Sequence, residues 1–242
     1  MSSQSKPELL VAWCSYAAAK YAVEHWHYSR IMPRSKNVYL GVWESNQFRG
    51  VIIFGLGAGA STNGRKYGLA KSFDVAELER VALLSHNAPV SRIVAIAISM
   101  LKHHSPNLRL LVSYADPAQG HNGSIYQAGN WVYVGSTPPD WRLVDAKGRM
   151  WHPRVVWKTK RKKHFGHPGR GIHISQGVRV ETPGKYKYLY PLDAEIRQRI
   201  LPLAQPYPKR QKDSSEPLGP PAEKGRGSTD PDAPQPQQAV LA

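Results

Sequence analysis

Cysteine is almost absent from this chain. Cys14 is the only one among 242 residues. A single thiol cannot build an intramolecular disulfide framework, and it cannot supply the cysteine ligands of a structural zinc site. A disulfide-stabilised fold and a cysteine-ligated zinc site are therefore both excluded within one chain. The cysteine usage is typical of a reducing cytoplasm.

Long apolar runs are missing as well. No stretch approaches the roughly 18 to 20 consecutive apolar residues that span a bilayer. The opening MSSQSKPELL lacks a basic region followed by an apolar one, which an export signal would need. We therefore expect a soluble cytoplasmic protein with no membrane contact.

Acidic residues are scarce relative to basic ones. The chain has 33 Lys and Arg against 17 Asp and Glu, a formal net charge of +16. An excess of this size seldom serves folding and is typical of proteins that bind polyanions. The charge predicts nucleic acid as the first partner to test, and a basic solvated surface is the alternative.

What is present suffices for one domain. Hydrophobic residues make up 41% of the chain, enough for one sizeable core. We predict a flexible N-terminus over residues 1–9 and a single domain over 10–201. Nine of the 20 prolines lie between 202 and 242, where apolar residues are few, so that tail is predicted to be disordered.

The pattern of elements predicts a mixed α/β domain, of the α/β or α+β class. Residues 90–104 carry apolar side chains at helical spacing, and 37–44 and 48–55 read as a hairpin. Residues 73–84 fit a helix or a strand equally well. A first helix is expected to end near Glu24. Together with strands at 108–112, 132–135 and 185–192, these elements imply one mixed sheet flanked by helices.

The central stretch runs from Leu108 to Trp131. An apolar strand stops there at Ser113, Tyr114, Ala115, Asp116 and Pro117, and a short helix follows that Gly129 closes. Ligands collect at the carboxyl ends of strands in open α/β sheets. The stretch is therefore the candidate site, with Asp116 and Tyr126 at its centre.

Family motifs occur in and around this stretch. HNGSIYQAGNWVYVG, residues 121–135, resembles the last conserved part of GNAT-superfamily N-acetyltransferases. More specifically, five segments in one order resemble the Mom family of phage DNA-modification proteins: HWHYSRIMP, ELERVAL, VSYADP, GHNGSIYQAGNW and YLYPLD. The resemblance covers roughly residues 10–195.

The resemblance implies a GNAT-like fold and a function. Members of the Mom family convert adenine in double-stranded DNA to N6-carbamoylmethyladenine, which protects phage DNA from host restriction. Two alternatives stay open: a GNAT-type N-acetyltransferase that uses acetyl-coenzyme A on a protein or small-molecule amine, and a non-enzymatic DNA-binding protein. No helix-turn-helix or zinc motif supports the latter.

The carbon donor is not identified by the sequence. Coenzyme A users of the superfamily carry a glycine-rich loop whose backbone amides hold the pyrophosphate. Here that place reads Ser85 to Val90, without glycine and with a proline that lacks an N–H. The family product also has a CH₂ on the adenine nitrogen, whereas simple acyl transfer would leave an amide.

Five residues are the catalytic candidates. Asp116 would accept a proton or hydrogen bond from adenine N6, and its alternative is an Asp-Pro turn. Tyr126 would be the general acid for the leaving group, and its alternative is a half-buried helix tyrosine without a catalytic role. Arg80 would hold an anionic or carbonyl donor group, against an ion pair with neighbouring glutamates. Tyr28 and Ser124 complete the set, although Ser124 could simply cap its helix.

Adenine must leave the base stack to react, so base flipping is expected. Aromatic side chains would stack on the flipped base, and their alternative is core packing. Tyr114 and Trp131 are the main candidates, beside Trp26 and Tyr133.

Histidines 25 and 27 raise the question of a metal. Residues two apart in an extended segment share a face, so His25 and His27 could converge there, whereas on a helix they would point apart. A set of His27, Tyr28 and Asp116 suits iron better than zinc. A polar wall of the site and ordinary surface histidines are the alternatives.

Residues 141–184 show no core-forming periodicity and read as a basic DNA-contacting insertion. Cationic side chains within it would neutralise phosphates and release counterions, with a mobile solvated loop as the alternative. The predicted DNA contacts are Lys158, Lys160, Arg161, Lys162, Lys163 and Arg170.

Overall fold

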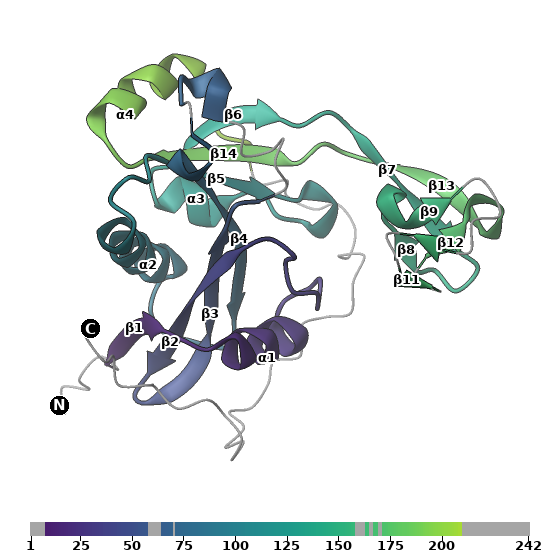
Figure 1. Ribbon diagram of the computed structural model, residues 1–242, viewed down its shortest axis with the longest axis horizontal. Helices are drawn as coiled ribbons and strands as arrows, with labels where there is room; N and C mark the ends of the chain where they lie inside the picture. Colours follow the sequence, from purple (N-terminus) through teal and green to yellow (C-terminus); the bar gives the residue numbers. More distant parts are fainter. Residues whose placement is uncertain are drawn as a thin grey trace.

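The computed structural model describes residues 8–57, 64–69, 71–157, 163–164, 167–168 and 171–209. A seven-stranded sheet forms its body (Figure 1). Its strands are β1 (Leu9–Trp13), β2 (Asn37–Glu44), β3 (Gln47–Gly55), β4 (Val75–Leu83), β5 (Leu110–Ala115), β6 (Val132–Ser136) and β14 (Tyr186–Pro191). The helices are α1 (Tyr16–Trp26), α2 (Val90–His104), α3 (Ser124–Ala128) and α4 (Ala194–Ile200).

The sheet is mixed, which confirms the predicted fold class. Its strand order is β1-β2-β3-β4-β5-β14-β6. Only β4 and β5 pair in parallel, and α2 is the crossover between them; the remaining neighbours are antiparallel. A parallel pair needs such a crossover, because the chain must return to the same edge of the sheet.

The two parallel strands separate soon after they meet. They pair only over the first three positions, from Val75–Leu110 to Glu77–Val112. Beyond this point β4 follows β3 instead, through a register shift opposite Ile53 and Phe54. The backbone of β5 therefore lacks its β4 neighbour from Ser113 onward, and the sheet is split there.

Helices cover both faces of the sheet. Alternation along β3 places Ile52 and Phe54 against α2 and α3, and Val51 and Ile53 against α1. The second face continues under α4, where Leu110 and Val112 of β5 join a separate cluster. Each fully buried side chain of this kind contributes about 1.5–3 kcal/mol. None of the helices in the described part is long and apolar enough to cross a membrane.

Several predicted elements are confirmed. The hairpin is β2 and β3, and α2 spans residues 90–104 as its spacing indicates. The ambiguous segment 73–84 contributes strand β4, because it lies between β3 and β5 and shares hydrogen bonds with both.

Two predictions near the N-terminus are wrong. Leu9 does not belong to a flexible segment, because β1 pairs with β2 from Leu9–Glu44 to Trp13–Leu40. Helix α1 extends to Trp26 rather than Glu24, so His25 is helical. Ser15 caps its start by accepting a hydrogen bond from the Ala18 N–H.

The basic insertion is more regular than its sequence predicts. Strands β7 (Asp140–Asp145), β8 (Met150–Trp151) and β13 (Gly177–Thr182) form a three-stranded sheet, and Leu143 is fully buried. Short strands β9 (Val156–Trp157) and β12 (Ile172–His173) pair beside it, as do β10 (Lys163–His164) and β11 (His167–Pro168). Residues 140–182 are here called the arm, and the described part of the arm projects away from the main sheet (Figure 1).

The tail packs against the domain for longer than predicted. After α4 and the short helix at Leu201–Leu203, the Gln205 N–H donates to the Tyr133 carbonyl. The Tyr207 hydroxyl donates to the Trp131 carbonyl at 2.7 Å. Residues 202–209 are thus ordered against β6, and 210–242 lie outside the described residues.

Candidate functional site

Tyr126 lies at the split between β4 and β5. Its hydroxyl is 2.8 Å from Ser113 Oγ, which is also 2.8 Å from the Leu78 carbonyl oxygen. The Ser113 hydroxyl has one hydrogen, and a carbonyl can only accept. Ser113 therefore donates to Leu78, and Tyr126 donates to Ser113. This chain of hydrogen bonds spans the gap where the parallel ladder ends.

Burial keeps Tyr126 protonated. The residue is 7% exposed, and burial raises the pKa of its hydroxyl to about 12. A phenol in this state can give a proton but cannot serve as a base at neutral pH. The geometry is consistent with the predicted acid role.

Helix α3 is held in place by Tyr188 of β14. Its N-cap, Gly123, has φ +80°, and a Cβ there would overlap the Tyr188 ring. The Tyr188 hydroxyl donates to the Asn122 carbonyl at 2.7 Å. Glycine is required at this position for both its backbone angle and the close ring. These contacts orient Tyr126 toward the split.

A second wall comes from the segment after α1. The Tyr28 ring meets the His121 ring edge-on at 5.5 Å and lies 4.4 Å from the His27 ring. Tyr28 contributes to the raised pKa of Tyr126, and Asp116 opposes the lowering of the His121 pKa by burial. The segment after α1 therefore approaches the loop between β5 and α3 through the contact of Tyr28 with His121.

His25 and His27 do not converge, so the predicted extended pair is wrong. His25 lies in the last turn of α1, where Nδ1 contacts the Tyr21 carbonyl at 2.8 Å. His27 Nδ1 accepts from the Ser29 N–H at 3.1 Å, which leaves the neutral ring's proton on Nε2. Burial, then Arg80 and His121, lower the pKa of His27 to about 3. No group of three His, Cys, Asp or Glu residues in the described part could hold a metal.

Arg80 follows the register shift in β4. It donates to the Glu79 carbonyl at 2.7 Å and to the Ile31 carbonyl at 3.4 Å. Its Nε is buried and has no hydrogen-bond partner among the described residues. The predicted alternative, an ion pair with a neighbouring glutamate, does not form, since the Glu79 carboxylate accepts from Ser35 and from the Gly57 N–H.

Asp116 forms the predicted Asp-Pro turn and an ion pair that was not predicted. One carboxylate oxygen accepts from the Ala118 N–H at 3.1 Å and caps the helical turn at Pro117–Gln119. The other lies 3.3 Å from Lys185 Nζ. Each carboxylate oxygen can accept a further hydrogen bond. The turn and the ion pair fix the carboxylate's orientation and leave its chemistry open.

The remaining predicted site residues lie apart from the split. Ser124 is exposed in the first turn of α3, but Gly123 is the N-cap, so the capping alternative is wrong. Trp131 is 1% exposed and packs on Tyr126, which leaves no face for a flipped base in this structure. Tyr114 points to the opposite face of the sheet, where the Lys187 ammonium lies 5.7 Å from its ring.

Most predicted DNA contacts cannot be placed. Lys158, Lys160, Arg161, Lys162 and Arg170 lie outside the described residues. The backbone of Lys163 belongs to β10 and pairs with Pro168 of β11. All six map to the arm.

The start of α2 is closed by an internal carboxylate. Glu44, 1% exposed, accepts from the Asn87 N–H at 2.8 Å and the Ala88 N–H at 2.7 Å. Burial alone would raise the pKa of Glu44, but these backbone hydrogen bonds outweigh it and lower the pKa. Pro89, the N-cap, has no N–H. Two of the amides just before the helix, those of Asn87 and Ala88, are therefore already engaged.

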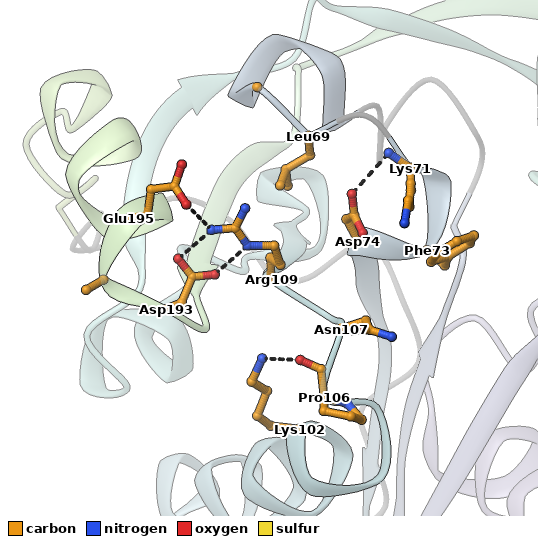
Figure 2. A pocket seen from close by; sticks show the side chains of 12 residues that line it. Leu69, Lys71, Phe73, Asp74, Lys102, Pro106, Asn107, Arg109, Asp193 and Glu195 are labelled. Carbon is orange, nitrogen blue, oxygen red and sulfur yellow. Dashed lines mark hydrogen bonds and ion pairs between the residues drawn. The ribbon is translucent and has the colours of Figure 1, made fainter.

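Two cavities flank the sheet away from the split. Figure 2 shows the first, about 760 Å³ in volume, at the amino ends of β4 and β5. Arg109 contacts both Asp193 and Glu195, Asp193 caps α4, and the Lys102 ammonium donates to the Pro106 carbonyl. We assign this cavity a structural role in anchoring α4.

The second cavity is larger, about 1130 Å³, and lies on the α4 face of the sheet. It is lined by residues of β4, β5, β6 and β14 together with the segment after α4. Three lysines and one glutamate line it: Lys66, Lys185, Lys187 and Glu77.

Sequence reasoning missed five residues around these sites: Ser113, His121, Lys185, Lys187 and Glu44. A signal existed for two of them. The alternation KYKYLYPL places Lys185 and Lys187 on one face of the strand, where Lys187 is buried and the Lys185 side chain is 40% exposed. Glu44 gave no signal, because its partners lie 43 and 44 residues away.

Comparisons with known proteins agree on a family. The model of the Mom protein family matches residues 8–209. The methylcarbamoylase Mom of Escherichia phage Mu is 26% identical over 211 residues, which cover 84% of each chain. Two solved structures are reported for the fold. A probable GNAT-family acetyltransferase from Chromobacterium violaceum has a TM-score of 0.40 and 9% identity, covering 79% of this chain and 92% of that one. FeeM, an N-acyl amino acid synthase from uncultured soil microbes, has a TM-score of 0.44 and 11% identity, and the match covers 83% of this chain and 97% of that one.

Proposed function

The chain belongs to the Mom protein family, and we propose that it is a phage-type enzyme that converts adenine in double-stranded DNA to N6-carbamoylmethyladenine. The observation that carries the proposal is the family match over residues 8–209. The phage Mu relative, named a methylcarbamoylase, supports an enzymatic role. Protection of phage DNA from restriction would follow from the modified base.

The reaction forms one bond and breaks another. Adenine N6 attacks the CH₂ carbon of the donor, and the bond from that carbon to the leaving group breaks with its electron pair. N6 loses one proton, and the leaving group gains one. Asp116 accepts either the N6 proton itself or a hydrogen bond from N6 as that proton leaves. Tyr126 supplies the proton to the leaving group.

Ser113 supports Tyr126 in this scheme. Its hydroxyl donates to Leu78 while the phenol keeps its proton. Once Tyr126 has given that proton away, the Ser113 hydroxyl can rotate and donate to the phenolate. A hydrogen bond to the charged form offsets part of the cost of a buried phenolate.

Arg80 and Tyr28 hold the reactants on the other side of the split. The guanidinium of Arg80 would hold an anionic or carbonyl group, which its buried and unpartnered Nε could contact only after the side chain moves. The exposed ring of Tyr28, next to His121, offers an aromatic face for the flipped adenine. Tyr28 replaces Trp131 in this role, because Trp131 is buried.

An acyl-coenzyme A donor bound at the start of α2 is not part of the proposal. Glu44 occupies the amides of that segment, and a pyrophosphate there would meet a buried carboxylate. This disfavours the acetyltransferase alternative. No metal is assigned a step, and iron at His27 and Tyr28 would first need the Ser29 contact to open.

DNA would be held by the arm. The sequence of this region is rich in Lys and Arg, and cationic side chains there would contact the phosphates of a duplex. The cytoplasm of a bacterial host is the expected place of action.

The test is mass spectrometry of nucleosides from cells that express the chain. A mass-shifted deoxyadenosine is expected with the unchanged protein and is expected to be lost with Asp116→Asn. Asp74→Asn is the matched control, since Asp74 also caps a short helical turn, by accepting from the Lys71 N–H at 3.0 Å. Unmodified adenine from cells that contain soluble protein would contradict the proposal. An acetylated amine formed from acetyl-coenzyme A would favour the acetyltransferase instead.

A further inference from the structure

A large apolar side chain projects into solvent from residues 27–36, here called the α1–β2 loop. Ile31 is 64% exposed, and Tyr28 is 52% exposed. The residue after Ile31, Met32, packs instead against the core cluster between α1 and the sheet. The loop therefore turns one large apolar side chain inward and leaves two in contact with water.

The backbone that carries Ile31 is held by hydrogen bonds. The Arg30 N–H donates to the His27 carbonyl at 3.0 Å, and Arg30 has φ +48°, which is uncommon for a residue with a Cβ. The guanidinium of Arg80 in β4 donates to the Ile31 carbonyl at 3.4 Å. These contacts fix the path of the chain on either side of Ile31, so its exposed side chain starts from a defined position.

The α1–β2 loop adjoins both sides of the split between β4 and β5. On the β4 side it contacts Arg80, just beyond the register shift. On the β5 side the Tyr28 ring meets the His121 ring at 5.5 Å, in the segment between β5 and α3. Isolated apolar side chains are common on protein surfaces. Ile31 differs from them because its loop borders the candidate site.

The charge of the loop favours a polyanion as its partner. Arg30 and Arg34, on either side of Ile31, are both exposed, and residues 25–43 contain no Asp or Glu. The Glu79 carboxylate reaches the loop by accepting a hydrogen bond from a serine hydroxyl. A neutral apolar partner would bury the two guanidinium groups at a cost. A duplex instead places phosphates on both sides of a stack of apolar base faces, which complements this composition.

We propose that Ile31 enters the base stack of the duplex at the place that the flipped adenine leaves, while Arg30 and Arg34 contact the neighbouring phosphates. Isoleucine is among the side chains that proteins insert between bases, and insertion offsets part of the cost of unstacking. Tyr28 would stack on the extruded base, so one loop would hold that base and close the gap behind it. The inference rests on the proposed function, because an enzyme that acts on a paired base must open the stack.

The test compares the affinity of the full chain for two short duplexes that differ in one position. One duplex has an intact adenine–thymine pair there, and the other has an abasic site opposite the thymine. The abasic duplex offers the gap without the cost of flipping, and it needs neither the donor nor a known sequence context. The unchanged protein is expected to prefer the abasic duplex at least about fivefold, because an isoleucine side chain is buried there.

Variants of the loop separate insertion from phosphate contact. Ile31→Ala is expected to bind the two duplexes equally, whereas Ile31→Met should keep the preference, because methionine is also long and apolar. Arg34→Gln is expected to weaken both duplexes alike and to lower the slope of log K against log salt by about 0.9. Leu10→Ala is the matched control, since it also truncates an exposed apolar side chain, on β1 at the far edge of the sheet, and should change neither affinity.

Three results would overturn the inference: equal affinity of the unchanged protein for the two duplexes, a preference that Ile31→Ala retains, or no binding to either duplex. The proposed function is tested separately, by the modified deoxyadenosine in cells that express the chain. Modified deoxyadenosine together with equal affinity for the two duplexes would reject the insertion of Ile31 and keep the enzyme.

Discussion

The Glu44 carboxylate accepts a 2.7 Å hydrogen bond from the Ala88 N–H, immediately before α2 begins. Helix starts of this kind bind phosphates, because their N–H groups lack intrahelical partners. Here the chain supplies the anion itself, from the end of β2. The absence of glycine in this segment and the position of Glu44 therefore both argue against a coenzyme A donor whose pyrophosphate binds at this helix start.

Glu44→Ala is expected to destabilise the protein by about 1–3 kcal/mol, because the Asn87 and Ala88 N–H groups lose their acceptor. Urea unfolding at pH 7 measures the change. Glu24→Ala is the control, since its half-exposed pair with Lys20 contributes at most about 1 kcal/mol.

The same contact has a pH signature. The pKa of Glu44 is lowered in the folded protein, so its stabilisation is complete above the unfolded value of about 4.3 and is lost as the pH falls through the folded value. The stability difference between the unchanged protein and Glu44→Gln should stay constant above pH 5 and shrink below it. A difference that grows on acidification would contradict this assignment.

Tyr126→Phe is expected to abolish adenine modification while the fold persists. It removes one hydrogen bond, worth about 1 kcal/mol, from a ring that otherwise packs unchanged. Nucleoside mass spectrometry and thermal unfolding measure the two effects. Tyr133→Phe is the control, because it also removes a buried tyrosine hydroxyl near a serine, here Ser136, and should retain activity.

Substitutions at Gly120 and Gly123, on either side of His121, allow the cost of backbone strain to be measured apart from the cost of a packing clash. Both have positive φ, but a Cβ at Gly120 meets nothing within 4 Å, whereas one at Gly123 overlaps Tyr188. Gly120→Ala should cost about 1–2 kcal/mol from its backbone conformation alone. Gly123→Ala should cost clearly more and should lower activity, because α3 must move. Equal losses in denaturant unfolding would show that the ring contact is unimportant.

Lys187 should make the free energy of unfolding depend on pH between about 7 and 10. Its folded pKa of about 7 lies below the unfolded value of about 10.4, so the unfolded chain binds more protons between these limits. Stability contributed at this site should therefore rise from pH 7 to pH 10. Lys187→Met should stabilise the protein at pH 7 and flatten that rise in urea unfolding. An unchanged slope would place the lysine in a more solvated environment.

The arm should account for the salt dependence of DNA binding. Replacing Lys160, Arg161 and Lys162 by Gln removes three charges, and the slope of log K against log salt should fall by roughly 2.7. The affinity should fall similarly for all sequences, because phosphate contacts do not read bases. Replacing Lys20, Lys36 and Lys71 removes equal charge outside the arm and should alter the slope much less.

Local patterns predicted the elements whose signals are local. Helix α2 carries apolar residues at helical spacing from Val90 to Leu101, and both of its bounds were predicted. The segment 73–84 could not be decided, because its pattern fits two periods and only pairing with β3 and β5 selects the strand. The arm was judged irregular because its core is small, although Leu143 and Ile172 are buried within it.

The family motifs indicated Asp116, Tyr126, Tyr28 and Arg80, and their catalytic roles stay predictions. The structure places Tyr126 at the split and the Tyr28 ring against His121. Trp131 was misjudged, because a sequence does not distinguish a tryptophan that faces a ligand from one enclosed by Tyr126 and Tyr190.

The sequence by itself determined the charge, the mixed α/β composition and the family, since these depend on residue identity and short-range order. Tertiary structure alone decided that Ser113 links Tyr126 to Leu78, that Glu44 accepts hydrogen bonds at the start of α2, and that the Lys187 ammonium lies over the Tyr67 ring. Each of these contacts joins segments distant along the chain. Such contacts depend on strand order and register, which pairing across the whole sheet fixes and no local pattern encodes.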